Sequence, residues 1–340
     1  MSATETAARG RTTLAMLAEE AGVSLSTISK VLNGRSDVAV ETRRRVEELL
    51  DKHEYRRRGA SVRASNLIEV VFHELWSVEI IAGVEEAARA NGMSVIISVS
   101  GDRHSPGPEW VQGVLARRPA GVVLVASGLS TLVAEQLRSR MIPFAVIDPS
   151  GDPSPDLPSV GSANWSGGLT ATRHLLELGH RRIAMVTGPE DVMCALARLD
   201  GFRSAMGSRG VPVREDWVRF GDFDTAGGRA AAEGLFAGDD RPTAVFAGND
   251  LMALGVIEVA TEHGLRVPQD LSVVGYDDRD FAVLSRPRLT TVHQPLKKMA
   301  AAATRMVLRL GAGEATDQRI DLATHLVVRE STAPVAAAAD

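Results

Sequence analysis

Apolar residues recur at helical spacing in the first 55 positions of the chain. Their pattern predicts three short helices, over residues 14–21, 25–32 and about 40–53. Thr13 stands where a side-chain oxygen caps the first helix, and Gly22-Val23-Ser24 predicts a tight turn before the second. The side chains expected to face inward are Leu14, Leu17, Ala18, Ala21, Ile28, Val31, Leu32, Val46, Leu49 and Leu50.

The second of these helices leaves short polar side chains on its outer face. A helix, a tight turn containing glycine and a second helix with a polar face together form a helix-turn-helix pattern. In that motif the second helix enters the major groove of DNA. The shape alone fits a small helical domain with solvated charge equally well, so the identity of the residues has to decide.

From about residue 67, short apolar runs alternate with amphipathic stretches. The runs predict strands over 68–72, 94–99, 121–125, 144–147, 182–187, 243–247 and 271–275. The stretches predict helices over 77–91, 132–140, 167–178, 196–209, 225–237, 250–263 and 295–310. This alternation is typical of an α/β fold with parallel sheets, and two successive runs of it predict two lobes. The predicted architecture is a small all-α head followed by a two-lobed parallel-sheet body.

Charge is distributed unevenly over the 340 residues. The chain carries a net charge of −5, which on its own argues against a nucleic-acid binder. Residues 1–65, however, hold 12 Lys and Arg and 9 Asp and Glu, a net charge of +3, so the body is the acidic part. A single cysteine, Cys194, excludes a disulfide framework and a cysteine-based zinc site. No apolar run approaches a membrane span, and the polar N-terminus predicts a cytoplasmic protein that associates with the nucleoid.

The head closely resembles the DNA-binding domain of the lactose/galactose repressor (LacI/GalR) family. The matching segments are Thr13-Leu14, Ala18, Ala21-Gly22-Val23-Ser24, Ser26-Thr27-Ile28-Ser29, Val31-Leu32-Asn33-Gly34, Glu41-Thr42-Arg43 and Tyr55-Arg56. The resemblance implies a homodimer that binds a pseudo-palindromic double-stranded operator. It also implies a hinge helix after Tyr55 that wedges a leucine into the minor groove. Ala64 takes that position here, so the basic hinge is expected to act more on phosphates than as a wedge.

The resemblance implies a division of labour among the DNA-binding residues. Leu25, Ser26 and Lys30 would read base edges, since a leucine contacts the thymine methyl and a lysine donates to guanine. Phosphate contacts or helix caps, which carry no sequence information, are expected of the remaining polar residues. The complete predicted set is Thr13, Ser24, Leu25, Ser26, Thr27, Ser29, Lys30, Asn33, Tyr55 and Arg58.

The body also resembles this family, whose body is similar to a periplasmic sugar-binding protein. The matching segments include Gly179-His180-Arg181-Arg182, Arg198-Leu199-Asp200-Gly201-Phe202, Asn249-Asp250, Val273-Val274-Gly275-Tyr276-Asp277 and Val328-Arg329-Glu330-Ser331-Thr332. The resemblance implies three crossings between lobes. The predicted division is a disordered tail over 1–11, a helix-turn-helix domain over 12–55, a basic hinge over 56–66 and an effector domain over 67–332, followed by a disordered tail over 333–340. Within the effector domain the N-lobe would take 67–160 and 290–320, and the C-lobe 161–289 and 321–332.

Ligands of parallel α/β sheets bind at the carboxyl ends of the strands. Asp148, Asn249 and Asp277 follow predicted strands, and Arg198 lies near the start of a predicted helix. The family resemblance implies that these four hold sugar hydroxyls, which carboxylates, amides and guanidinium groups bind well. Asp250 is expected to cap the helix over 250–263. The loops add aromatic and imidazole candidates, so the predicted effector set is His73, Trp76, Asp148, Trp165, Arg198, Phe223, Asn249 and Asp277.

Two further classes of function are weaker interpretations. An enzyme is disfavoured because no phosphate-binding loop, nucleophile elbow or zinc-protease motif occurs in the chain. A transport binding protein is disfavoured by the head. We therefore predict a repressor of carbohydrate-utilisation genes that needs no cofactor or metal and is controlled by a small sugar bound between the lobes. The alternative is the same architecture with a purine or other non-sugar effector, sandwiched by the aromatic residues.

Overall fold

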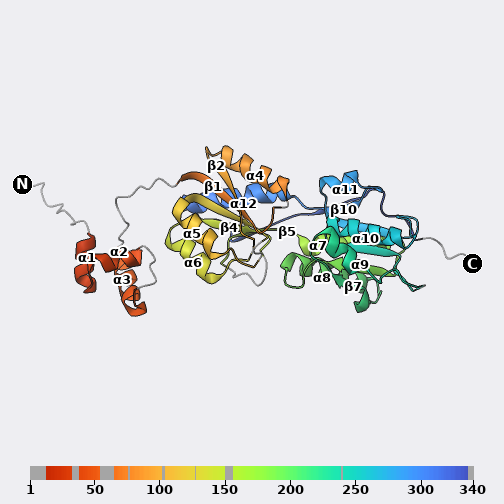
Figure 1. The fold of residues 1–340 in the computed structure, drawn as a ribbon, viewed down its shortest axis with the longest axis horizontal. Helices are drawn as coiled ribbons and strands as arrows, with labels where there is room; N and C mark the ends of the chain where they lie inside the picture. The colour runs from red at the N-terminus through yellow and green to blue at the C-terminus, as the bar shows by residue number, and fades with distance from the viewer. Residues whose placement is uncertain are drawn as a thin grey trace, which may run out of the picture.

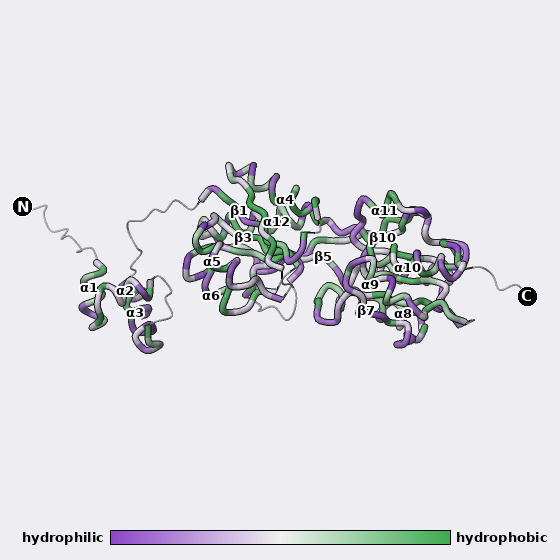
Figure 2. Tube along the Cα trace, viewed as in Figure 1, coloured by the Kyte–Doolittle hydropathy of each residue, from purple (hydrophilic) through white to green (hydrophobic). Residues whose placement is uncertain are grey.

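The computed structural model describes residues 13–32, 38–53, 65–75, 77–101, 104–126, 128–149, 156–238 and 240–335. Figure 1 shows a small helical head followed by two lobes, each built around a sheet with helices on both of its faces. Hydrophobic segments gather along the strands within each lobe (Figure 2). This is the predicted fold class, an all-α head and a two-lobed parallel-sheet body.

The head consists of α1 (Leu14–Ala21), α2 (Leu25–Leu32) and α3 (Val40–Lys52). The Oγ1 atom of Thr13 accepts a hydrogen bond from the backbone amide of Met16 at 3.3 Å, which confirms the predicted cap of α1. Gly22 ends that helix in the left-handed conformation, with φ at 65°, as the turn requires. Ser24 accepts from the amide of Thr27 at 3.1 Å and so caps α2. The predicted inward residues other than Leu32 form one cluster around the buried Leu17, Ile28 and Val46, and the side chain of Leu32 lies outside the described part of the structure.

The N-lobe is built on a six-stranded, fully parallel sheet in the order β11-β5-β4-β3-β1-β2. Its strands are β1 (Ser65–Phe72), β2 (Ser94–Val99), β3 (Pro119–Val125), β4 (Phe144–Ile147), β5 (Ser159–Ser162) and β11 (Arg319–Leu322). Apolar side chains on one face pack against α4 (Val78–Arg89) and α12 (Leu296–Gly311). Those on the other face pack against α5 (Pro108–Arg117) and α6 (Thr131–Ser139).

The C-lobe sheet has the order β12-β10-β9-β8-β6-β7, and β12 alone runs antiparallel to its neighbour. Its strands are β6 (Ile183–Thr187), β7 (Val218–Phe220), β8 (Ala244–Ala247), β9 (Ser272–Asp277), β10 (Thr290–His293) and β12 (His325–Val327). One face is covered by α7 (Asn164–Glu177) and α8 (Met193–Ser208), the other by α9 (Thr225–Ala232) and α10 (Asp250–Glu262). Two short elements, the 3-10 helix η1 (Glu215–Trp217) and α11 (Asp280–Leu284), complete the lobe.

The chain crosses between the two sheets three times, between β5 and α7, between β10 and α12, and between β11 and β12. The predicted lobe boundary at residue 290 is wrong, because residues 290–293 form β10 and pair with β9 of the C-lobe. The predicted boundary between 320 and 321 also splits β11, all of which pairs with β5 of the N-lobe. The predicted boundary between 160 and 161 splits β5 in the same way, since this strand pairs with β4 and β11 of the N-lobe. All three corrections arise from short strands next to a crossing.

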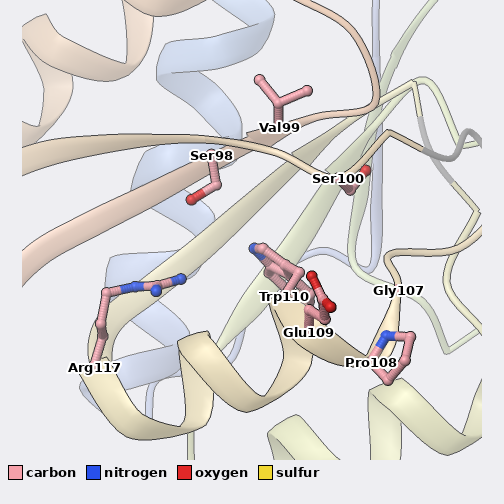
Figure 3. A pocket seen from close by; sticks show the side chains of 8 residues that line it. All are labelled: Ser98, Val99, Ser100, Gly107, Pro108, Glu109, Trp110 and Arg117. Atoms are coloured by element: carbon pink, nitrogen blue, oxygen red, sulfur yellow. The ribbon is translucent and has the colours of Figure 1, made fainter.

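A buried ion pair lies beneath one face of the N-lobe sheet. Glu69 on β1, the strand next to the edge strand β2, is fully buried and accepts hydrogen bonds from Ser98, Trp110 and Arg117. Arg117 binds it in bidentate fashion, with Nη2 at 2.6 Å and Nε at 3.1 Å. A cavity of about 530 Å³ lies above this cluster, between β2 and α5 (Figure 3). The donors already satisfy the carboxylate, so we interpret the pair as structural.

Candidate functional site

The outer face of α2 presents the residues predicted to read DNA. Ser24, Leu25, Ser26 and Lys30 are exposed, and Thr27 and Ser29 are partly exposed. Leu25 is the notable member, because a leucine with 53% of its surface exposed has no packing reason for that position. Thr13 and Ser24 serve as helix caps in the structure. Three other predicted contacts, Asn33, Tyr55 and Arg58, lie outside the described residues.

The predicted effector residues of the body converge where the two lobes meet. Asp148 follows β4 in the N-lobe, Asn249 follows β8 in the C-lobe, and Asp277 ends β9. Arg198 lies in the second turn of α8, which begins three residues earlier than predicted. Asp148 and Asp277 both adopt left-handed backbone conformations, with φ of 44° and 103°. Such strain in non-glycine residues concentrates at functional sites.

Arg198 is the centre of this arrangement, and its side chain is only 3% exposed. Its Nε atom donates to Oδ1 of Asn164 at 2.9 Å, and its Nη1 atom donates to the carbonyl of Gly248 at 2.6 Å. Its Nη2 atom donates to Oε1 of Gln294 at 2.8 Å. The Cζ atom of the guanidinium lies 3.7 Å from the ring centroid of Tyr276, and its Nη1 atom lies 3.8 Å from Oδ1 of Asp277. The fork is therefore fixed in position before any ligand arrives.

Two residues at the crossings between the lobes, Gln294 and Asn164, connect Arg198 to Asp148. Gln294 donates from Nε2 to Oδ2 of Asp148 at 2.9 Å, and Asn164 donates from Nδ2 to Oδ1 of Asp148 at 3.4 Å. Asp148, Gln294, Arg198 and Asn164 thus form a closed ring of hydrogen bonds, which we call the hinge ring. It joins an N-lobe carboxylate to a C-lobe guanidinium through two crossing segments.

A cavity of about 310 Å³ opens beside the hinge ring. Residues of both lobes line it, with Asp148, Arg319 and Asp321 on one side and Asn164, Trp165 and Cys194 on the other. Trp165 is 45% exposed, so its indole face is available to a ligand. It lies in the first turn of α7, where the sequence predicted a loop. The cavity therefore combines charged hydrogen-bonding groups with one aromatic face.

Burial governs the ionisation of the groups around this cavity. It raises the pKa of Asp148, although Arg198 and the hinge-ring amides oppose the shift. It raises the pKa of Asp277 to about 6, against the opposing effect of Arg198 and Arg279. Burial would lower the pKa of Arg198, but the surrounding acidic groups, including both carboxylates, outweigh it and raise that pKa. A permanently charged guanidinium thus holds two carboxylates that lack full solvation.

Asn249, rather than the predicted Asp250, caps α10. Its Oδ1 atom accepts from the amide of Met252 at 2.9 Å, and its Nδ2 atom donates to the carbonyl of Phe223 at 2.7 Å. Asp250 is fully buried and accepts from the hydroxyl of Thr291 and the amide of Arg279. The expectation of Asp250 as the cap is wrong, because these tertiary partners draw its carboxylate away from the helix start. Asn249, with both ends of its amide engaged, acts here as a structural residue.

Asp250→Asn is expected to flatten the dependence of stability on pH. Burial and the nearby Asp277 raise the pKa of Asp250 to about 8, whereas an unfolded aspartate titrates near 3.9. The native state therefore holds more protons than the unfolded state between these values, and stability falls as pH rises from about 4 to 8. Urea unfolding at pH 5.5 and pH 8 should show a smaller loss in the variant than in the parent protein. Equal losses in both proteins would contradict the assignment.

The remaining predicted effector residues have separate environments. Phe223 is half-buried with φ at 61°, and its ring packs so closely on Gly188 that a Cβ atom there would lie 2.2 Å from it. His73 follows β1 and is half-buried. Trp76 lies outside the described residues. The structure therefore brings together Asp148, Arg198, Asp277 and Trp165. Asn249 follows Gly248, whose carbonyl binds Arg198, and Asn249 in turn binds the carbonyl of Phe223.

Gln294 and Asn164 are site residues that the sequence prediction missed. Each is buried, and each follows the carboxyl end of a short strand, β10 or β5. That placement was the available signal, but neither strand was predicted. Cys194 also lines the cavity, one helical turn before Arg198, and burial raises the pKa of its thiol to about 12.

A helical DNA-binding head joined to a two-lobed ligand-binding body defines a class of ligand-controlled regulators. Residues 13–58 match the model of the lacI family of bacterial regulatory proteins, and residues 172–332 match the periplasmic binding protein-like domain. The regulator CelR of Thermobifida fusca is 34% identical over 95% of this chain and 99% of its own. The HTH-type transcriptional repressor PurR of Edwardsiella ictaluri is 32% identical over 94% of this chain and 97% of its own. The chain belongs to the LacI family of transcriptional regulators.

Two solved structures share both the head and the body of this chain. A complex of the regulator CelR with cellobiose has a TM-score of 0.72 at 32% identity, covering 94% of this chain and 100% of that one. A lac repressor dimer bound to its operator and the anti-inducer ONPF has a TM-score of 0.69 at 29% identity, covering 95% and 100%. Among the described residues no helix is long and apolar enough to span a bilayer, and no group of His, Cys, Asp and Glu is arranged to hold a metal.

Proposed function

We propose that this regulator binds an operator as a homodimer and that a small sugar in the interlobe cavity controls its affinity. The observation that carries the effector class is the lining of this cavity, where Asp148 and Arg319 lie beside the exposed face of Trp165. Carboxylates and guanidinium groups bind vicinal hydroxyls in pairs, and an indole packs on the C–H face of a sugar ring. The proposal assigns binding and no catalytic step to these residues.

A homodimer is supported by the similarity of this chain to the lac repressor, whose structure is a dimer bound to its operator. Val78 is 74% exposed and Val99 58% in the N-lobe, and Leu284 is 74% exposed in the C-lobe. These apolar side chains are open to contact with a second copy. Two heads related by a two-fold axis would place their α2 helices in successive major grooves of a pseudo-palindrome.

Effector control follows from the position of the cavity between the lobes. A sugar that contacts Asp148 of the N-lobe and Trp165 of the C-lobe binds most tightly at a single lobe angle. Its binding therefore shifts the protein toward that angle, and the heads toward or away from operator-binding geometry. A decisive shift requires the sugar to prefer one state by several kcal/mol.

The effector class is tested by thermal-shift measurements with cellobiose, ribose and hypoxanthine, followed by operator gel shifts with each hit. We expect a sugar to raise the melting temperature and to change operator affinity. Stabilisation by hypoxanthine alone would replace the sugar with a purine effector. No response to a broad panel of mono- and disaccharides would refute the sugar proposal.

Lys30→Ala is expected to weaken operator binding by about 1–3 kcal/mol and to relax specificity at one base position. Lys30 is exposed on the outer face of α2, where an ammonium group can donate to guanine O6 or N7. Selection from random DNA, with Kd values at fixed salt, measures both effects. Lys52→Ala is the matched control. Lys52 lies on α3 and its Nζ atom pairs with Glu20 of α1 at 2.8 Å, so its substitution should leave the sequence preference unchanged. An unaltered preference in Lys30→Ala would remove Lys30 from the base-reading set.

A further inference from the structure

We infer that Gln294 is a positioning residue that holds the effector-binding groups of the two lobes in one geometry. The inference rests on the proposed function and extends it to a residue outside the predicted site. Gln294 is 4% exposed and lies on the second crossing, between β10 of the C-lobe and α12 of the N-lobe. Its position lets a single side chain reach both lobes.

The amide of Gln294 has the polarity that its two partners require. Its NH₂ group donates to the Asp148 carboxylate at 2.9 Å, and its carbonyl oxygen accepts from the Arg198 guanidinium at 2.8 Å. Both bonds involve a charged partner and are therefore among the stronger hydrogen bonds in proteins. The backbone amide of Gln294 also donates to the carbonyl of Asp277 at 3.3 Å, which fixes the start of its side chain.

Asn164 forms the second half of the hinge ring and connects Arg198 to Asp148 independently of Gln294. Asn164, on the first crossing, accepts from Arg198 at 2.9 Å and donates to Asp148 at 3.4 Å. Two crossings are thereby cross-linked through one carboxylate and one guanidinium. A change in lobe angle has to lengthen at least one bond of the ring, so the ring ties the angle of the lobes to the placement of Asp148 and Arg198. The two hydrogen bonds of Gln294, at 2.8 and 2.9 Å, are together shorter than those of Asn164, at 2.9 and 3.4 Å. The connection through Gln294 is therefore the tighter of the two.

The link can be tested without any effector, by measuring the distance between spin labels in the two lobes. Cysteines introduced at exposed positions, Ser139→Cys on α6 and Ser204→Cys on α8, carry the labels. Cys194→Ala is included in every labelled protein, because the native thiol is partly exposed and lines the interlobe cavity. Gln294→Met keeps the length of the side chain and removes both hydrogen bonds. We expect it to broaden the distance distribution, and a distribution that superimposes on that of the parent protein would overturn the inference.

A polarity exchange separates positioning from a general loss of stability. Gln294→Glu should broaden the distribution, because its carboxylate accepts from Arg198 but repels Asp148. Adding Asp148→Asn restores a donor opposite the new acceptor, and the double variant should return to the narrow distribution. Failure of this rescue would also overturn the inference. Thr304→Val is the matched control, because this buried hydroxyl binds only the carbonyl of Ala300 within α12 and should not alter the lobe distance.

Operator titrations with and without cellobiose extend the test to regulation. The parent protein is expected to show a change in operator Kd in the usual range of about 5–150-fold for allosteric coupling. Gln294→Met should still bind cellobiose in calorimetry but reduce this change to within about 2-fold of unity. Full retention of coupling would contradict the role of Gln294. A parent protein that binds no sugar would instead refute the proposed effector class, while the label distances would still decide the role of Gln294.

Discussion

Arg198→Ala is expected to abolish the response to the effector and to lower the free energy of unfolding by about 3–5 kcal/mol. The side chain is 3% exposed and supplies hydrogen bonds to Asn164, Gly248 and Gln294. Its removal leaves three acceptors without a donor and two half-desolvated carboxylates without their counter-charge. Urea unfolding measures the loss of stability, and operator titration with a sugar that stabilises the parent protein in the thermal-shift measurements measures the loss of response.

The control for Arg198→Ala lies on the same helix. Arg203→Ala removes an exposed guanidinium that pairs with Glu215 at 2.8 Å, with side-chain exposures of 42% and 67%. A surface pair of this kind contributes about 0–1 kcal/mol, so this variant should keep both its stability and its response. Arg198→Ala with parental stability and a normal response to the sugar would rule out both the ring and the site.

Arg117→Ala is expected to destabilise the N-lobe by about 3 kcal/mol while leaving the cavity between the lobes intact. The substitution leaves Glu69, a fully buried carboxylate on β1, with only Ser98 and Trp110 as donors. Arg117 itself is 38% exposed, so water can replace part of its contribution. The measurement is the midpoint of thermal unfolding, together with near-ultraviolet circular dichroism of Trp110.

Replacing both members of this pair should restore most of the lost stability. Glu69→Met combined with Arg117→Met removes the charge that would otherwise stay buried, and such exchanges are often neutral or stabilising. The double variant should therefore melt above Arg117→Ala. A double variant that melts lower than the single variant would show that the polar cluster, rather than its charge balance, determines the packing between β1 and α5.

The parts of the fold that the sequence predicted well are those whose physics is local. Strands such as β3 and β8 are continuous apolar runs buried on both faces, so the hydrophobic pattern alone marks them. The helices of the head were predicted with their caps because Thr13, Gly22 and Ser24 act within a few residues of their own positions. Strand β11 was missed because it has only four residues, which alternate between exposed polar and half-buried apolar side chains.

The site was predicted in part because its residues act over long separations in the chain. Asp148, Arg198 and Asp277 follow from a rule about strand ends and from the family pattern. Gln294 has its partners 146 and 96 residues away, and no local pattern distinguishes it from a surface glutamine. The choice between Asn249 and Asp250 as the helix cap had the same origin, since Thr291 decides it from 41 residues away.

The three crossings also constrain how the chain acquires its structure during synthesis. The head is finished after about 53 residues, and its small core needs nothing further along the chain. The N-lobe core, in contrast, contains Met299 and Val307 of α12, and its sheet ends in β11. A ribosome that has released residues 65–162 has therefore exposed a sheet with one face covered only by α4. That face stays open to chaperones and to aggregation until residues 296–322 emerge.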